Sequence, residues 1–149
     1  MASALVVYAT ITGNNEDVAD VITEALEDLG VDVDETEITQ ADAEEFEDAD
    51  ICVVCPYTYD EGALPEEGMD FYEDLQELDL SGKIYGVAGS GDTFYLDDYC
   101  VSVDKFAAAF EKAKAIKGTE AVKINLEPEN EDINTLNAFA KSLVEKVND

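Results

Sequence analysis

The sequence contains no histidine, no arginine and no tryptophan. Histidine is the most common general base at neutral pH, and arginine is a frequent clamp for oxyanions, so two standard groups of enzyme catalysis are missing. All eight positively charged side chains are lysines, against 37 Asp and Glu residues, and the formal net charge is -29. The composition therefore favours a carrier or binding protein over an enzyme with its own substrate.

Positive charge is missing from more than half of the chain. Residues 1–82 contain no lysine, and five of the eight lysines lie between Lys105 and Lys123. Nucleic acid and anionic membranes repel such a chain, whereas opposite fields speed its encounter with a basic protein. We therefore expect basic protein partners, no nucleic acid and no membrane. A surface that serves only solubility or salt adaptation is the alternative.

The sequence also has no long apolar run. No segment approaches the roughly 18 consecutive apolar residues that a membrane span needs. The N-terminal residues lack the basic region of a signal peptide. Cys52, Cys55 and Cys100 are the only cysteines, which suits a reducing compartment. We therefore expect a cytoplasmic location.

Cys52 and Cys55 form a C-x-x-C motif, which is typical of redox and metal sites. However, the surrounding sequence, "DICVVCPY", is apolar enough to form a buried strand. Positions i and i+3 of a strand point to opposite faces, so the two sulfurs should diverge. Without histidine and with one further cysteine, a zinc site lacks ligands. The motif therefore favours a buried strand, and we expect no metal site.

Strand-like and helix-like segments alternate along the chain. Apolar runs predict strands at 4–9, 31–38, 50–55, 83–89 and 120–126. Helical periodicity or composition predicts helices at 18–29, 66–78, 99–114 and 133–147, with at most a short helix at 41–49. This alternation is typical of right-handed crossovers that connect the strands of a parallel sheet.

The prediction is one monomeric α/β domain over residues 1–149, with a three-layer doubly wound fold. Its five parallel strands should follow the order 2-1-3-4-5, with helices on both faces and the alternating strand 31–38 at an edge. The side chains expected to face inward on the first and last helices are Val18, Val21, Ile22, Ala25, Leu26 and Leu29, and Ile133, Leu136, Ala140, Leu143, Val144 and Val147.

Ligands of this fold bind beyond the carboxyl ends of the strands, near the switch point between strands one and three. The loop after strand one, "TITGNNE", offers the side chains of Thr10, Thr12, Asn14 and Asn15. Its backbone N–H groups converge at a helix N-terminus, so they could hold phosphate without a cation. Neither a Walker A motif nor a G-x-G-x-x-G motif is present. A simple helix N-cap at Thr12 or Asn14 is the alternative.

The loops after strands three and four carry aromatic residues. Tyr59 and Tyr95 could stack on the two faces of a flat ring, and Asp60, Glu61 and Asp92 would exclude further anions. An aromatic packing cluster is the alternative for this pair alone. Together with the phosphate loop, these tyrosines indicate a planar heterocycle on a phosphorylated chain.

The run T-x-T-G-N-N-E, then "YTYDEG", then "GSGDTFY", resembles the flavodoxin family. The resemblance covers the whole chain, and the last strand lacks a long insertion, as in short-chain flavodoxins. It implies a non-covalently bound FMN that carries one electron at a time, at low potential, between reductases and acceptor enzymes. A flavin-storage module would share the same site and is the alternative function.

The resemblance also implies which residues bind FMN. The first loop would hold the phosphate, the second would cover one face of the ring, and Ser90 to Asp92 would line its pyrimidine edge. The chain departs from the family pattern at Ile11, at Tyr59 and at Asp60. It also has one extra residue, Leu96, and because of this extra residue Phe94 could replace Tyr95 as the stacking ring. The implied set is Thr10, Ile11, Thr12, Gly13, Asn14, Asn15, Pro56, Tyr57, Thr58, Tyr59, Asp60, Gly62, Ser90, Gly91, Asp92, Phe94, Tyr95 and Cys100.

Overall fold

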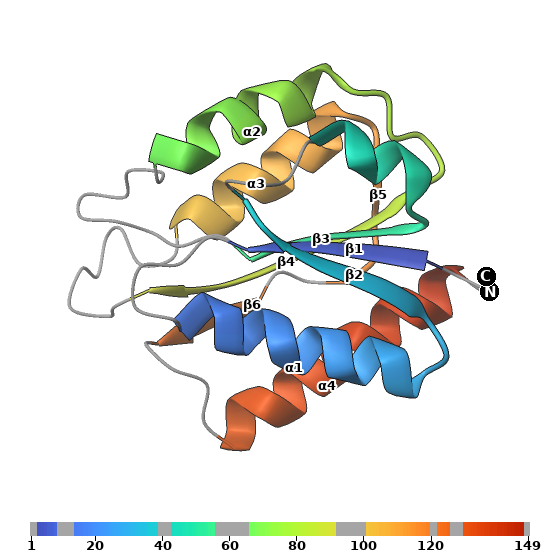
Figure 1. Cartoon of the computed structure of the whole chain (residues 1–149), viewed down its shortest axis with the longest axis vertical. Helices are drawn as coiled ribbons and strands as arrows, with labels where there is room; N and C mark the ends of the chain where they lie inside the picture. The colour runs from blue at the N-terminus through green and yellow to red at the C-terminus, as the bar shows by residue number, and fades with distance from the viewer. Residues whose placement is uncertain are drawn as a thin grey trace.

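The chain folds into three layers, with a parallel sheet between two layers of helices (Figure 1). The computed structural model describes residues 3–8, 14–38, 43–55, 66–91, 101–119, 122–125 and 130–147. The strands are β1 (Ser3–Tyr8), β2 (Asp32–Glu37), β3 (Ile51–Cys55), β4 (Ile84–Gly91), β5 (Ile116–Lys117) and β6 (Val122–Asn125). The helices are α1 (Asn14–Asp28), η1 (Ala43–Asp48, a 3-10 helix), α2 (Glu66–Glu77), α3 (Val101–Lys112) and α4 (Asn130–Val147).

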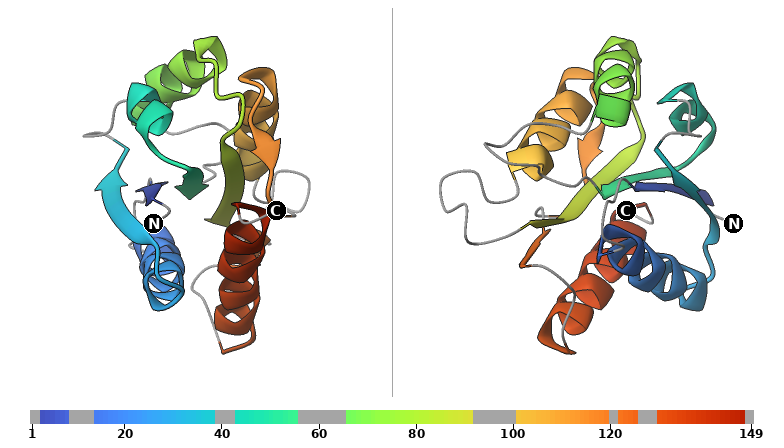
Figure 2. Two further views of the ribbon diagram at one scale, coloured as in Figure 1. Left: turned by 90° about the vertical axis from the view of Figure 1, so that its right-hand side faces the viewer. Right: turned by 60° about the vertical axis from the view of Figure 1, so that its left-hand side comes forward.

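The strand order is β2-β1-β3-β4-β5, and every pair is parallel, which confirms the predicted doubly wound sheet. All residues of β3 are buried, as expected for a strand covered on both faces. β2 has a neighbour on one side only, and none of its residues is fully buried. Figures 1 and 2 show α2, α3 and η1 on one face and α1 and α4 on the other.

At the fifth position of the sheet, the structure has two strands where the sequence predicts one strand at 120–126. Two short strands pair in succession with β4: Ile84 lies opposite Ile116, and further along Ala88 lies opposite Val122. Between them, the Gly118 N–H donates a hydrogen bond to the Tyr85 carbonyl at 2.9 Å. The two residues of β5 were missed because a strand of that length has no detectable periodicity.

The helices agree with the predicted segments, and the apolar stripes of α1 and α4 face the sheet. Leu26 and Leu136 are fully buried, for example. Two stripe predictions were wrong, because Leu29 is 44% exposed and Ile133 is 36% exposed. Leu29 lies beyond the last residue of α1, and Ile133 lies in the first turn of α4, so both fall past the part of the helix that covers the sheet.

The two faces of the sheet have different cores. Beneath α2, α3 and η1, an aromatic cluster of Phe46, Phe71, Phe106 and Phe110 is buried, and Tyr85 of β4 stacks on Phe110 with ring centroids 4.9 Å apart. Beneath α1 and α4 the core is aliphatic apart from Phe139 and Cys55. Its members include Val18, Ile22, Leu26, Leu136, Ala140 and Leu143.

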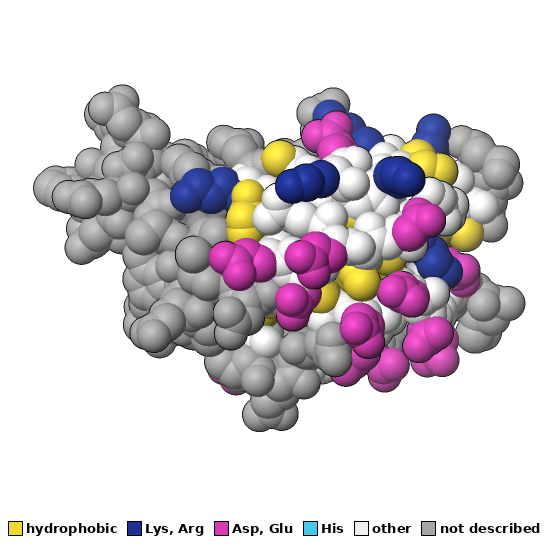
Figure 3. All heavy atoms as spheres, turned by 90° about the horizontal axis from the view of Figure 1, so that it is seen from above, with side chains coloured by type: hydrophobic (Ala, Val, Ile, Leu, Met, Phe, Trp, Pro, Cys, Tyr) yellow, Lys and Arg dark blue, Asp and Glu magenta, His cyan; other side chains and the backbone are white. Residues whose placement is uncertain are grey.

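Charge is also divided over the surface. Figure 3 looks down on the layer of α2 and α3, and shows lysine side chains gathered over one half of this face and carboxylates over the other. The two kinds of charge come from different parts of the sequence. Residues 1–82, which include β2 and η1, contain no lysine, whereas α3 and β5 carry lysines. No helix in the described part of the chain combines the length and apolar composition needed to cross a bilayer.

Gly118 lies between β5 and β6, and because it has no side chain, α4 can pack closely at this point. A Cβ at this position would lie 2.5 Å from Ile84 Cγ2, 2.5 Å from Leu143 Cδ2 and 3.1 Å from the Tyr85 carbonyl oxygen. Gly118→Ala should therefore lower the free energy of unfolding by about 1–3 kcal/mol. Urea unfolding, followed by circular dichroism, measures this change.

The matched control is Gly82→Asn. Gly82 has a φ of 86° with nothing within 4 Å of an added Cβ, and asparagine tolerates that conformation better than most residues. Its free energy of unfolding should change much less. Equal effects at the two glycines would contradict the close approach of α4.

Candidate functional site

The central strands end along one edge of the sheet. Tyr8, the last residue of β1, lies opposite Cys55, the last residue of β3. Val54 lies opposite Val87, and β4 continues from there to Gly91. Residues 9–13, 56–65 and 92–100 follow these strand ends in the sequence. The three loops that carry the predicted binding residues therefore start from one edge.

The structure describes only four of the predicted cofactor-binding residues. Asn14 and Asn15 begin α1, while Ser90 and Gly91 end β4. The remaining predicted residues lie outside the described part of the chain: Thr10, Ile11, Thr12, Gly13, Pro56, Tyr57, Thr58, Tyr59, Asp60, Gly62, Asp92, Phe94, Tyr95 and Cys100.

The N-terminus of α1 lies near the edge where these strands end (Figure 1). The first N–H groups of a helix have no partner within it, and the helix dipole adds partial positive charge at that end. α1 has 15 residues and follows directly after the loop rich in hydroxyl and amide groups in the sequence. Both effects of the helix start therefore act next to that loop. These features of the helix start suit an anionic group such as a phosphate.

One further residue comes to the same edge. Asn125, the last residue of β6, lies opposite Gly91 in the sheet. No sequence motif marks this position. The signal was available, since the carboxyl end of any strand in this fold borders the ligand edge.

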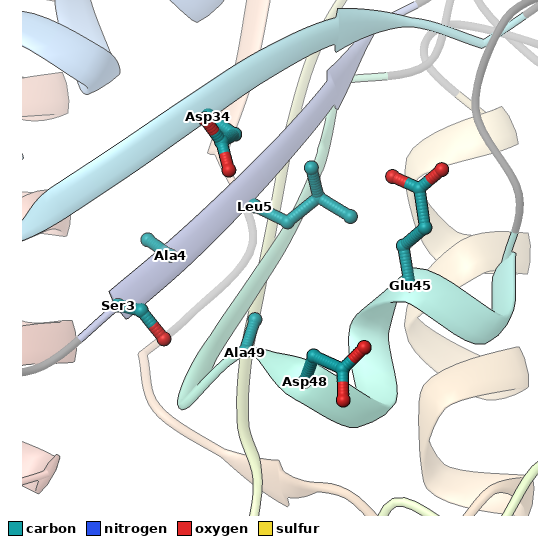
Figure 4. Close-up of a pocket in the computed structure, with 7 residues that line it drawn as sticks. All are labelled: Ser3, Ala4, Leu5, Asp34, Glu45, Asp48 and Ala49. Atoms are coloured by element: carbon teal, nitrogen blue, oxygen red, sulfur yellow. The ribbon is translucent and has the colours of Figure 1, made fainter.

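A cavity of about 210 Å³ opens at the opposite end of β1 (Figure 4). Its lining comes from the start of β1, from β2 and from η1 with the residue that follows it. Three of the lining side chains are carboxylates, which would repel an anionic ligand. The cavity therefore does not suit a phosphate. The lining residues are Ser3, Ala4, Leu5, Asp34, Glu45, Asp48 and Ala49.

The C-x-x-C motif lies in β3, and its sulfurs diverge as predicted. Cys52 is buried in the aromatic core, where its Sγ lies 3.7 Å from the Phe46 carbonyl oxygen, whereas Cys55 is buried in the core beneath α1 and α4. Burial raises the pKa of the Cys52 thiol to about 12. Burial, with a smaller effect of Glu35, raises the pKa of the Cys55 thiol still further.

These two cysteines therefore stay as neutral thiols at physiological pH and cannot form a disulfide with each other. Among the described residues, no group of three or more Cys, Asp and Glu side chains converges as a metal site.

Comparison with known proteins agrees with the geometry of the site. The flavodoxin family model matches residues 6–138. Probable flavodoxin 1 of Bacillus subtilis is 36% identical over 97% of this chain and 91% of its own length. Probable flavodoxin 2 of the same organism is 38% identical over 98% of this chain and 97% of its own length.

Two solved structures are more similar still. A short-chain flavodoxin associated with a non-canonical PDU bacterial microcompartment has 58% identity and a TM-score of 0.97, covering 99% of both chains. The TIGR4 flavodoxin of Streptococcus pneumoniae has 53% identity and a TM-score of 0.95, covering 98% of this chain and all of the other.

The fold, the ligand edge and these similarities define a flavin-binding electron-transfer protein rather than an enzyme. The chain belongs to the flavodoxin family, and its cofactor is FMN.

Because Cys52 and Cys55 are buried, the rate at which their thiols react with a reagent is a measure of unfolding. At pH 8 a pKa of about 12 leaves about one thiolate in 10⁴, and the core also excludes reagents. In a Cys100→Ser variant, a thiol reagent such as DTNB should therefore react only at the rate of local or global unfolding. Both thiols should react at once in concentrated urea. Rapid labelling of the folded variant would contradict the burial of this motif.

Proposed function

We propose that this chain is a low-potential one-electron carrier that holds FMN non-covalently and shuttles electrons between reductases and acceptor enzymes. The observation that carries the proposal is the start of α1 at Asn14, beside the edge where β1, β3 and β4 end. That arrangement supports an anion site next to two aromatic loops. A flavin-storage module would share it, but the flavodoxin relatives favour electron transfer.

The phosphate would be held by Thr10 to Asn15 and by the backbone N–H groups at the start of α1. These donors are neutral, so their effect is local, and a phosphate can be bound although the chain is strongly anionic. Ile11, which lacks a hydroxyl, would contribute only its backbone N–H. Bonds from several donors to one charged group are stronger than bonds between neutral groups.

The flavin ring would lie between the second and third loops. Tyr57 to Gly62 would cover one face with Tyr59 as its large side chain, and Tyr95 or Phe94 would stack on the other. Ser90, at the end of β4, would begin the segment along the pyrimidine edge. FMN, when bound, supplies the electron-accepting ring, and the protein binds it, orients it and limits its contact with water.

The acidic surface would lower the reduction potential, because an added electron brings negative charge among carboxylates. One carboxylate about 10 Å away opposes that charge by about 0.4 kcal/mol in water and about 1.7 kcal/mol at an effective dielectric near 20. For one electron these energies correspond to roughly 17 and 70 mV. β2, beside β1, contributes Asp32, Asp34, Glu35 and Glu37 to this field.

We infer that the chain works as a monomeric single domain in the cytoplasm, with basic protein partners and without nucleic acid or membrane. The family supports redox partners such as reductases. The net charge supports their basic character. The chain has only three cysteines, which suits a reducing compartment.

The phosphate assignment predicts a selective loss of affinity. Thr12→Ala combined with Asn14→Ala removes two hydrogen bonds to a charged group, which should cost about 1.5–3 kcal/mol each in FMN binding. Riboflavin lacks the phosphate, so it should bind the native protein much more weakly and lose little affinity in the double variant. Fluorescence titration of the cofactor-free protein measures both constants. Equal affinity of the native protein for FMN and riboflavin would refute the assignment.

The partner assignment predicts that salt slows association. Carboxylates near the ligand edge, among them Glu66 and Glu67 at the start of α2, should attract a basic one-electron acceptor protein. Stopped-flow rates should fall steeply with ionic strength, because exposed charges are screened over about 8 Å at 0.15 M. Glu66→Gln with Glu67→Gln should reduce this salt dependence more than the control pair, Glu27→Gln with Asp28→Asn, at the other end of α1. Rates that do not change with salt would leave only the solubility explanation.

A further inference from the structure

The helices α2 and α3 follow directly after the two loops that should cover the flavin ring. α2 begins at Glu66, after residues 56–65, and α3 begins at Val101, after residues 92–100. Figure 1 shows both helices beginning on the same side of the molecule, toward the end of β4. The distance between the two helix starts therefore limits how far apart the two loops can lie.

Aromatic rings join these two helices. Phe106 of α3 lies edge-to-face against Tyr72 of α2, with ring centroids 5.4 Å apart and an angle of 83° between the ring planes. The centroid of Phe106 also lies 6.4 Å from that of Phe71. The strength of such pairs depends on ring orientation, because the edge of a ring is positive and its face is negative. These three residues form the α2–α3 ring contact.

The ring contact lies close to the two helix starts. Tyr72 is six residues after the start of α2, and Phe106 is five residues after the start of α3. At 1.5 Å per residue, these positions are about 9 and 8 Å along the two helix axes. Phe106 is fully buried and Tyr72 is half-buried. A packed contact so near the starts fixes their separation more firmly than a contact farther along the helices.

The next turn of α3 contacts other elements of the fold. Phe110 lies 5.4 Å from Phe46 of η1 and 4.9 Å from Tyr85 of β4, measured between ring centroids. It is fully buried, like Phe106, and belongs to the same aromatic core. Phe110 therefore attaches α3 to η1 and to the sheet, whereas Phe106 attaches it to the rings of α2.

The phosphate loop is attached to a different core. α1 follows that loop in the sequence and packs on the opposite face of the sheet (Figure 2). There Val18, Ile22 and Leu26 belong to the aliphatic core. Because the sheet separates the two cores, a change at Phe106 should affect the second and third loops and not the first.

We propose that the α2–α3 ring contact positions the two loops for the flavin ring, and that Phe106 is its central positioning residue. This inference rests on the proposed assignment of these loops to the ring. A ligand loses affinity when it must itself set the separation of the loops, and it keeps that affinity when the separation is already formed. The ring contact therefore supports binding of the isoalloxazine and not of the phosphate.

The test compares Phe106→Leu with Phe110→Leu, which makes the same change in the same helix and core. Both variants should lower the urea midpoint by similar amounts, since both residues are fully buried. Only Phe106→Leu should weaken the binding of riboflavin and FMN, each by about three- to tenfold, so their affinity ratio stays within about twofold of the native ratio. Fluorescence titration of the cofactor-free proteins gives the affinities. The visible circular dichroism of bound FMN should also change in Phe106→Leu alone.

Variants at Tyr72 test the same contact at a half-buried position, and they decide the question if Phe106→Leu does not fold. Tyr72→Leu should reproduce the loss of affinity, whereas Tyr72→Phe keeps the ring and should bind like the native chain. Tyr72→Leu combined with Phe106→Leu should lose little more than the larger single loss, because both changes remove one contact. The proposal is overturned if Phe106→Leu and Phe110→Leu weaken riboflavin binding equally, or if Tyr72→Leu leaves it unchanged.

Tyr59→Ala distinguishes the positioning role from the assignment of the second loop. This variant should weaken riboflavin binding if that loop covers the ring. A loss with Tyr59→Ala, but none with Phe106→Leu or Tyr72→Leu, would refute the positioning role alone. No loss with Tyr59→Ala would refute the loop assignment and, with it, this proposal.

Discussion

Parallel pairing between β1, β3 and β4 is the constraint on which the rest of this structure depends. In a parallel sheet each strand must return to the same starting edge, so each connection crosses a face of the sheet and each carboxyl end comes to one side. Tyr8 beside Cys55, and Val54 beside Val87, establish that alignment. The pairing brings the strand ends from which three loops start to one edge, although these strand ends are far apart in the sequence. The same rule brings Asn125 to that edge, opposite Gly91.

The net charge of -29 poses an electrostatic problem for the proposed phosphate site. Neutral N–H and hydroxyl donors at the carboxyl edge would act over a few ångströms without opposing the field farther away. A phosphate could therefore be held there although the chain as a whole repels anions.

Most of the fold could be predicted because burial leaves a clear pattern. β3 is apolar at every position, and α1 and α4 repeat apolar residues at helical spacing. The errors arise where that pattern stops being informative. Leu29 and Ile133 continue the spacing past the part of the helix that covers the sheet, and β5 is too short to have a period.

For the site, the sequence indicates the position of each loop and the chemistry of its side chains. Asn14 and Ser90 lie where the strand order requires. The choice between Tyr95 and Phe94 as the stacking ring stays a prediction, because it depends on how the extra residue at Leu96 is accommodated. Spacing along a strand or helix implies a direction for each side chain, whereas spacing along a loop does not.

The carboxylates of β2 have a consequence for the behaviour of the protein at high concentration. An edge strand offers unpaired N–H and C=O groups to any extended chain, including a second copy or a partly unfolded neighbour. Asp32, Asp34, Glu35 and Glu37 occupy four of the six positions of this strand, so an identical strand would bring equal charges against them. On the opposite side, the edge is divided between β5, which has two residues, and β6, which has four. Both edges therefore discourage the intermolecular β-sheet of aggregates.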